Sequence, residues 1–182
     1  MFSASAHKFN GPRGVGFLYV RKGININPLI VGGMQESNLL AGTENVAAIV
    51  AMAVALQKNC KEMAKIRERL FGIEKIFLDT LNEKKLDYIR NGSANRIPGN
   101  ISLSIRDMNG EMLMHRLDLK GICVSTGAAC DSVNTQRSHV LKAILIPENY
   151  ANGTIRISFG KYNTENEAIT VAKEILAIAG KV

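Results

Sequence analysis

The stretch Arg96–Ser132, RIPGNISLSIRDMNGEMLMHRLDLKGICVSTGAACDS, contains the pattern that decides the fold. Apolar and polar residues alternate from Ile101 to Ile105, which predicts a strand with one buried face. Apolar residues at helical spacing then predict a helix over Glu111–Leu119, and Ile122–Ser125 predicts another strand. A strand, a helix and a strand in this order are typical of a two-layer α/β unit.

The same alternation continues on both sides of this stretch. It predicts a helix after Phe71 to about Lys84, a strand at Tyr88–Arg90, a helix over Ser138–Leu145, a strand over Thr154–Phe159 and a closing helix over Thr164–Ala179. Thr164 and Glu167 have the spacing of a capping box at the start of that last helix. We therefore expect one α/β unit over residues 71–182.

The residues before this unit predict a single strand and one long helix. Val15–Val20 is apolar and lies between glycine turns, which predicts a strand. Thr43 is placed to cap a long helix that runs from Val46 to about Leu70, with Glu44 in its first turn. A helix of this length can link two domains, so we divide the chain into residues 1–42, a connecting helix over 43–70 and the α/β unit over 71–182.

The composition is that of a soluble globular protein, with 46% hydrophobic and 21% charged residues among 182. The most apolar run, Val46–Leu56, is shorter than the roughly 20 residues that a membrane span needs, and the first residues do not resemble a signal peptide. We therefore expect a cytoplasmic protein and no membrane partner.

The formal net charge is +7, but the basic residues are scattered among acidic neighbours without interleaved aromatic residues. This pattern argues against nucleic-acid binding. It favours a solvated basic surface or docking to an acidic protein.

The three cysteines do not suggest a disulfide framework or a zinc site, because their number is odd and they lack ligand spacing. Cys60 lies in a helical pattern and Cys123 in a predicted strand, so we expect both to be packed. Cys130 instead lies between the small residues Gly127–Ala129 and the polar pair Asp131–Ser132. This setting predicts an exposed loop thiol that is free to act as a nucleophile.

A lysine near the start of the chain, in SAHKFNGPRGVG (residues 5–16), complements this thiol. The glycines after Lys8 leave the backbone open to a bulky planar ligand, and Ser5 and His7 could donate hydrogen bonds to a phosphate. Lys8 is thus a candidate for a Schiff base with pyridoxal 5'-phosphate (PLP). The amine would hold the cofactor, and the thiol of Cys130 would accept a group from the substrate.

Five motifs in one order mark the chain as similar to the C-terminal half of the NifS/IscS-like cysteine desulfurases, which are PLP enzymes of the aminotransferase class V group. They are SAHKFNGPRGVGFLYVRKG, then GGMQE with AGTEN, then RIPGNISLSI with GEMLMHRLDLKGICVSTGAACDS, then SHVLKAI, and last IRISFGKYNTENE. The resemblance implies the C-terminal small domain of a fold-type I PLP-dependent transferase. It makes residues 1–42 a remnant of the large PLP-binding domain.

The resemblance also implies a role for each matched position. Lys8 is similar to the lysine that forms the Schiff base and moves protons, and Ser5 and His7 are similar to phosphate ligands. Thr43 is similar to a threonine that reaches the cofactor phosphate of a partner subunit, which implies a homodimer.

Two further positions concern the substrate. Arg156 is similar to the arginine that binds the substrate carboxylate. Cys130 is similar to the thiol that attacks the sulfur of L-cysteine, leaving an enzyme persulfide and releasing alanine. The intact enzyme would pass this sulfur to an acceptor or scaffold protein for iron-sulfur cluster or thio-cofactor assembly.

The family's upstream half, with its ring-stacking histidine and its aspartate for the pyridine nitrogen, has no counterpart among the 182 residues. We therefore expect weak or no PLP binding and no catalysis by the chain alone, and we expect Val15–Val20 to lack its strand partners. One alternative is a non-catalytic domain for dimerisation or for binding the sulfur acceptor. Another alternative is a selenocysteine lyase or a class V aminotransferase.

Overall fold

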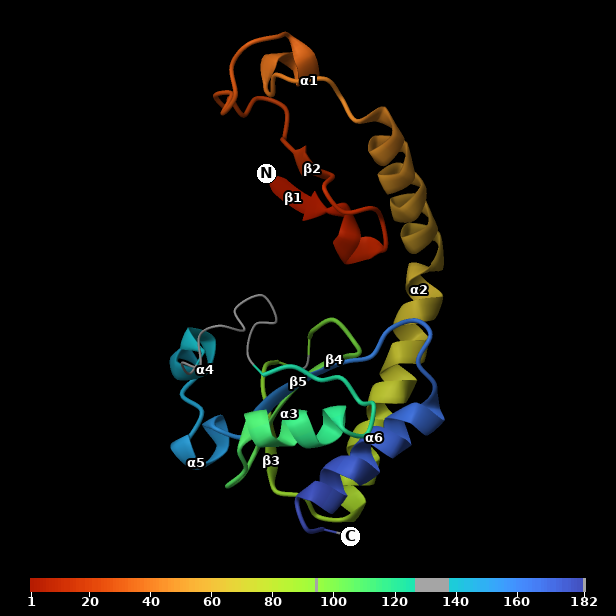
Figure 1. Cartoon of the computed structure of the whole chain (residues 1–182), viewed down its shortest axis with the longest axis vertical. Helices are drawn as coiled ribbons and strands as arrows, with labels where there is room; N and C mark the ends of the chain where they lie inside the picture. The colour runs from red at the N-terminus through yellow and green to blue at the C-terminus, as the bar shows by residue number, and fades with distance from the viewer. Residues whose placement is uncertain (94, 127–137, 182) are drawn as a thin grey trace. The chain divides into compact units, whose positions relative to one another are not determined.

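The computed structural model describes residues 1–93, 95–126 and 138–181 (Figure 1). The chain forms two compact units, Met1–Ala64 and Lys65–Val182, and each unit has its own β-sheet. None of the helices in these described ranges combines the length and hydrophobicity that crossing a membrane requires.

The first unit is built around a hairpin. Strand β1 (Phe2–Ser5) runs antiparallel to β2 (Gly16–Tyr19), and the short 3-10 helix η1 (Ala6–Phe9) lies in the connection between them. A Cβ atom on Gly16 would lie only 2.5 Å from the carbonyl oxygen of Ala4, so the pairing requires glycine there. Our expectation that residues 15–20 lack a strand partner is therefore wrong, because β1 supplies one.

Residues after the hairpin form the four-residue helix α1 (Gln35–Asn38) and then the long helix α2 (Val46–Glu83). The sequence predicts two helical stretches that meet at Phe71, but the structure has one helix of 38 residues. Gly72 lies inside it, where a glycine costs only about 1 kcal/mol relative to alanine and does not end a helix.

The cap of α2 also differs from the prediction. The side-chain oxygen Oδ1 of Asn45, not Thr43, accepts the N–H of Ala48 at 3.2 Å. Asn45 stands directly before the first helical residue, where a side-chain acceptor reaches the unpaired amides of the first turn.

The second unit contains an antiparallel sheet with the order β3-β4-β5, formed by Tyr88–Arg90, Asn100–Ile105 and Thr154–Ser158. Its helices are the second part of α2, α3 (Gly110–Asp118), α4 (His139–Ala143), α5 (Glu148–Ala151) and α6 (Glu165–Ile178). The α/β class predicted for this part of the chain is confirmed, as is the capping box of Thr164 and Glu167.

One face of this sheet carries the core. Residues from α2, α3 and α6 pack against the alternate residues of β4 and β5 that point to the same side, and the central members are Ile73, Phe77, Leu81, Ile101, Leu103, Leu113, Leu117, Ile155, Ile157 and Ile175. The rings of Phe77 and Phe159 meet edge to face with their centroids 5.6 Å apart. This packing fixes β5, and with it every side chain that β5 presents to the opposite face.

The opposite face of the sheet is polar. The side-chain amide of Asn91 donates to the hydroxyl oxygens of Ser102 and Ser104 at 3.0 and 2.8 Å, and Ser104 is 2.7 Å from the hydroxyl of Thr154. Arg156 of β5 pairs with Ser102 of β4 and therefore lies on this polar face.

The predicted strand at Ile122–Ser125 is reduced to a single bridge between Ser125 and Arg156. Ile122–Val124, which precede this bridge, form no strand pairing with β5, so the prediction of a full strand is wrong.

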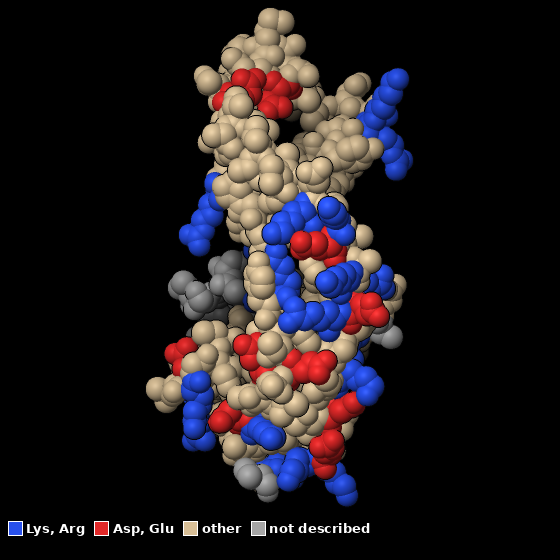
Figure 2. All heavy atoms as spheres, turned by 90° about the vertical axis from the view of Figure 1, so that its right-hand side faces the viewer, with Lys and Arg blue, Asp and Glu red and all other residues tan. Residues whose placement is uncertain are grey.

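Charged side chains are mixed in sign on the face that Figure 2 shows, where blue and red groups alternate over the second unit. This agrees with the scattered charge pattern of the sequence.

Candidate functional site

Lys8 lies on the short helix η1, directly after β1. Ala6 is fully buried, its N–H donates to the carbonyl of Val15, and its own carbonyl accepts the N–H of Gly11. These contacts hold the helix inside the hairpin turn, whereas His7 and Lys8 remain exposed. The structure thus presents an exposed amine and an exposed imidazole on one turn that is held by main-chain hydrogen bonds.

A residue that the sequence analysis missed fixes this turn to α2. The side-chain amide of Asn59 donates to the carbonyl oxygen of Phe9 at 2.7 Å and to that of Ala55, one helical turn earlier, at 2.8 Å. No sequence signal singled out Asn59, because its neighbours in α2 are polar as well, among them Gln57, Lys58, Lys61 and Glu62. Asn59 therefore positions η1, and through it Lys8.

Ser5 is exposed at the end of β1, immediately before η1, so Ser5, His7 and Lys8 share one turn of the first unit. Thr43 is also exposed, in the connection that precedes α2. Within the described residues, no hydrogen bond joins Thr43 to the other three.

Arg156 lies in the second unit, on the polar face of β5. The main chain of Arg156 forms two hydrogen bonds with that of Ser125. The N–H of Ser125 donates to the carbonyl of Arg156 at 3.1 Å, and the N–H of Arg156 donates to the carbonyl of Ser125 at 2.6 Å. Its side-chain Nε is shielded from solvent and has no hydrogen-bond partner among the described residues. The same is true of the Nε atoms of Arg90 and Arg96, so the missing partner does not by itself mark Arg156 as a ligand site.

Cys130 lies outside the described residues. The segment that leads to it is anchored by the Ser125–Arg156 bridge, and Thr126 is the last described residue before it. The other two cysteines are both exposed, which corrects our expectation that they are packed. Cys60 is exposed on α2, and Cys123 lies two residues before the Ser125–Arg156 bridge.

The predicted site residues belong to two different units. Ser5, His7, Lys8 and Thr43 belong to the first unit, and Arg156 belongs to the second. In the described ranges, no cluster of three or more His, Cys, Asp or Glu side chains could hold a metal ion.

Comparison with known proteins gives consistent matches. A family model described as aminotransferase class-V matches residues 1–171. A curated cysteine desulfurase IscS from Dictyoglomus turgidum is 46% identical over 168 residues, which cover 92% of this chain and 43% of that protein.

Two solved structures give the same picture. A NifS-like protein aligns with a TM-score of 0.85 and 36% identity, over 99% of this chain and 46% of its own. SspA in complex with cysteine aligns with a TM-score of 0.62 and 29% identity, over 89% of this chain and 44% of its own. The chain thus spans less than half the length of the curated relatives that it matches.

Proposed function

The chain belongs to the aminotransferase class-V family, and from this premise we propose that it forms part of a PLP-dependent cysteine desulfurase. The observation that carries the proposal is the 46% sequence identity to a cysteine desulfurase over 92% of this chain. The proposed reaction moves the sulfur of L-cysteine to an enzyme thiol and releases alanine.

The cofactor residues are proposed to be Lys8, Ser5, His7 and, from a partner subunit, Thr43. The chemistry of the first three suits PLP, because an exposed amine stands beside a hydroxyl and an imidazole on one turn. PLP, when bound, withdraws electrons from the substrate carbon. Lys8 would bond the cofactor's carbonyl carbon and carry a proton at Nζ, while Ser5 and His7 would donate hydrogen bonds to the phosphate.

Arg156 is proposed to bind the substrate carboxylate. Its shielded Nε lacks a partner among the described residues, and a guanidinium offers two parallel donors to a carboxylate. SspA, a structural neighbour, was solved in complex with cysteine, which supports an amino-acid substrate of this size.

Cys130 is proposed to attack the sulfur of the bound cysteine as a thiolate. The carbon–sulfur bond breaks, a sulfur–sulfur bond forms on Cys130, and the substrate carbon receives a proton to become alanine. The enzyme persulfide would then pass its outer sulfur to the thiol of an acceptor protein.

The domain division is proposed on the same basis. Residues 1–42 would belong to a large PLP-binding domain, 43–70 to the connecting helix and 71–182 to a C-terminal small domain. A shared site through Thr43 would make the active assembly a homodimer.

The test measures transfer of sulfur to the cysteines of the chain. The purified chain is incubated with L-cysteine, with and without the intact Dictyoglomus turgidum desulfurase, and persulfide on each cysteine is mapped by mass spectrometry. We expect no alanine from the chain alone, and sulfur from the intact enzyme to collect on Cys130. Cys60→Ser is the matched control and should not change this uptake. If Cys130→Ser takes up as much sulfur as the unchanged chain, the proposed role is wrong.

A further inference from the structure

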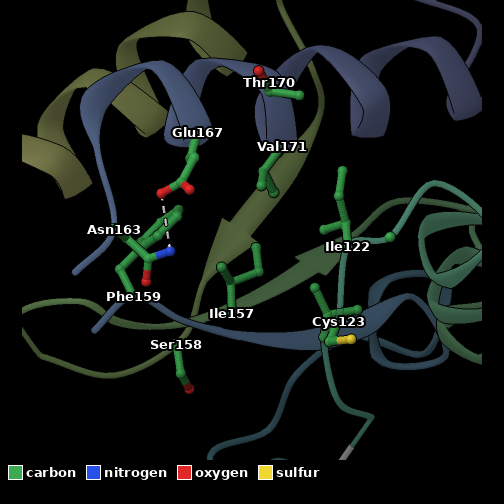
Figure 3. Close-up of a pocket in the computed structure, with 11 residues that line it drawn as sticks. Ile122, Cys123, Ile157, Ser158, Phe159, Asn163, Glu167, Thr170 and Val171 are labelled. Carbon is green, nitrogen blue, oxygen red and sulfur yellow. Dashed lines mark hydrogen bonds between the residues drawn. The ribbon is translucent and has the colours of Figure 1, made fainter. Parts of the chain in front are cut away.

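Arg156 has a serine opposite it on the neighbouring strand, because Ser102 of β4 pairs with Arg156 of β5. Figure 3 shows Ile157 pointing toward α6 and Ser158 pointing to the opposite side of β5. Since successive side chains of a strand alternate, Arg156 lies on the side of Ser158, away from the core. Ser102 and Arg156 therefore share the polar face of the sheet.

The pairing of these two residues brings their side chains close together. The N–H and carbonyl of Arg156 bond to Ser125 and not to β4. Ser102 and Arg156 are thus a non-hydrogen-bonded pair, the kind in which antiparallel side chains lie closest, with Cβ atoms about 5 Å apart. At this separation a guanidinium and a hydroxyl can bind the same small ligand.

The pair lies where burial changes along the polar face. Ser104 is fully buried and Thr154 is 9% exposed, whereas Ser158 at the other end of this face is exposed. Ser102 and Arg156 lie between these ends and are half-buried. A small ligand could reach them from solvent and still be partly shielded, which strengthens its hydrogen bonds.

The hydrogen bonds of this face determine which protons are already used. The hydroxyl of Thr154 donates to the carbonyl of Ala151 at 2.8 Å, so it accepts in its 2.7 Å contact with Ser104. Ser104 donates its single proton there and can only accept from Asn91. The side-chain nitrogen of Asn91 therefore faces both serines, and Ser102 accepts from it at 3.0 Å.

One proton of this network remains without an acceptor. Ser102 accepts from Asn91, and no described residue accepts the hydroxyl proton of Ser102. Its neighbour across the strand is Arg156, whose side chain can only donate. The two side chains thus offer donors to the same space and no acceptor between them, which suits an anionic oxygen.

We propose that Ser102 is a substrate-binding residue that donates a further hydrogen bond to the carboxylate held by Arg156. The guanidinium supplies two parallel donors, and the hydroxyl of Ser102 supplies a third. Asn91 is a positioning residue, because its amide occupies a lone pair of Ser102 and so orients the hydroxyl proton. The inference rests on the proposed role of Arg156, and it makes the site selective for a free carboxylate over a neutral amide.

The probe for this site is L-alanine, the proposed product, which carries the carboxylate but no thiol that could react with the exposed cysteines. The Nε–H of Arg156 is shielded from solvent, so its proton should exchange slowly enough to be observed by heteronuclear NMR of the labelled chain. The signal is identified by its loss in Arg156→Lys. We expect L-alanine to shift this signal and L-alaninamide, which lacks the negative charge, to leave it in place.

Variants of Ser102 test its share of the binding. Ser102→Ala should raise the dissociation constant for L-alanine about tenfold, the effect of one hydrogen bond to a charged group. Ser102→Thr keeps the hydroxyl and should bind as the unchanged chain does. Ser158→Ala removes a serine from the same face of β5 and is the matched control, which should leave the constant unchanged. Circular dichroism checks the folding of each variant.

The positioning role of Asn91 has its own readout. Asn91→Ala should raise the dissociation constant about threefold, because the hydroxyl of Ser102 is then free to turn. In the Ser102→Ala chain the same change should have no further effect. A merely structural role of Asn91 would weaken binding equally in both chains, which would overturn this part of the proposal.

Two other results would overturn the proposal, and they differ in what they leave standing. An unchanged dissociation constant in Ser102→Ala would remove Ser102 from the site and keep Arg156. The absence of any L-alanine shift on the Arg156 signal would remove the carboxylate site itself. Sulfur uptake by Cys130 is measured separately, so failure of the desulfurase proposal would not be confused with either result.

Discussion

The two units of this chain differ in how many of their apolar side chains are buried. In residues 65–182, helices and strands far apart in sequence share one core. In residues 1–64, all of which are described, Ala6 and Met52 are the only buried apolar residues, while Leu29 is 93% and Val31 78% exposed. On the face that Figure 2 shows, charged side chains are dense over the second unit and sparse over much of the first.

This difference shows that a high share of apolar residues does not by itself make a self-sufficient unit. A two-stranded sheet is marginal in water without further strands or helices to cover it. The exposed apolar residues of the first unit form the kind of surface that normally contacts other protein. We therefore expect stability to be concentrated in the second unit, and the following experiments test that contrast.

The largest effect is expected from the core of the second unit. Phe77 is fully buried against Phe159, so Phe77→Ala should lower the free energy of unfolding by about 3–5 kcal/mol through the cavity that it leaves. Leu29→Ala, in the first unit, should change it by less than about 0.5 kcal/mol. Urea denaturation measures both. Equal losses would mean that the two units are alike.

The next largest loss of stability is expected from removing a buried carboxylate. Glu74 is 3% exposed, forms ion pairs with Arg90 and Arg96, and accepts the N–H of Gly99 at 2.9 Å. Glu74→Ala would leave both guanidinium groups without their carboxylate, so we expect a loss of about 3 kcal/mol.

The matched control for Glu74 is Asp79 on the same helix. Its ion pair with Lys75 is exposed, and Asp79→Ala should cost less than about 1 kcal/mol. Urea denaturation again gives both values. If the two variants lost similar stability, burial of Glu74 would not be the reason for its effect.

The strands should also differ in hydrogen exchange. Amides of β4, which is paired on both sides, should exchange about 100-fold more slowly than those of β2, which is paired only with β1. Exchange followed by mass spectrometry on peptides from each strand measures the ratio. Similar rates would show that the hairpin is covered in solution and that the contrast between the units fails.

The family and fold class were predictable from sequence because several motifs occur in one order, and the comparisons confirm both. Tyr88–Arg90 and Thr154 were placed correctly because alternation and turn residues act locally. The partner of β2 was missed because β1 has only four residues, too few for its alternation to stand out as a strand pattern. The roles of Lys8 and the other site residues stay predictions.

Long-range contacts explain the remaining differences. The Asn59 contact to Phe9 and the divergence of Ile122–Ser125 from β5 depend on residues far apart in sequence. Local patterns carry no information on such contacts. The exposure of Cys60 has the same cause, because a helical pattern shows which residues share a face but not whether another element covers it.

The smallest effect concerns a surface cluster of the second unit. The hydroxyl of Tyr150 donates to Oδ1 of Asp87 at 2.7 Å, and Arg106 donates to Oδ2 at 3.1 Å. These bonds, that of Tyr150 foremost, lower the pKa of the Asp87 carboxyl. Because the folded pKa lies below the ordinary value of about 3.9, the cluster stabilises the fold above that pH, and the gain is lost as pH falls through the folded pKa.

Tyr150→Phe removes the larger cause and should move the pKa of Asp87 up toward its ordinary value, so that the acid-dependent loss of stability becomes smaller and is complete at a higher pH. Titration of the carboxyl carbon by NMR measures the shift. Tyr162→Phe is the control, because Tyr162 is exposed and its ring contacts Lys161 rather than Asp87. An unchanged Asp87 pKa in Tyr150→Phe would mean that Arg106 alone sets it, and that the tyrosine contact is not maintained in solution.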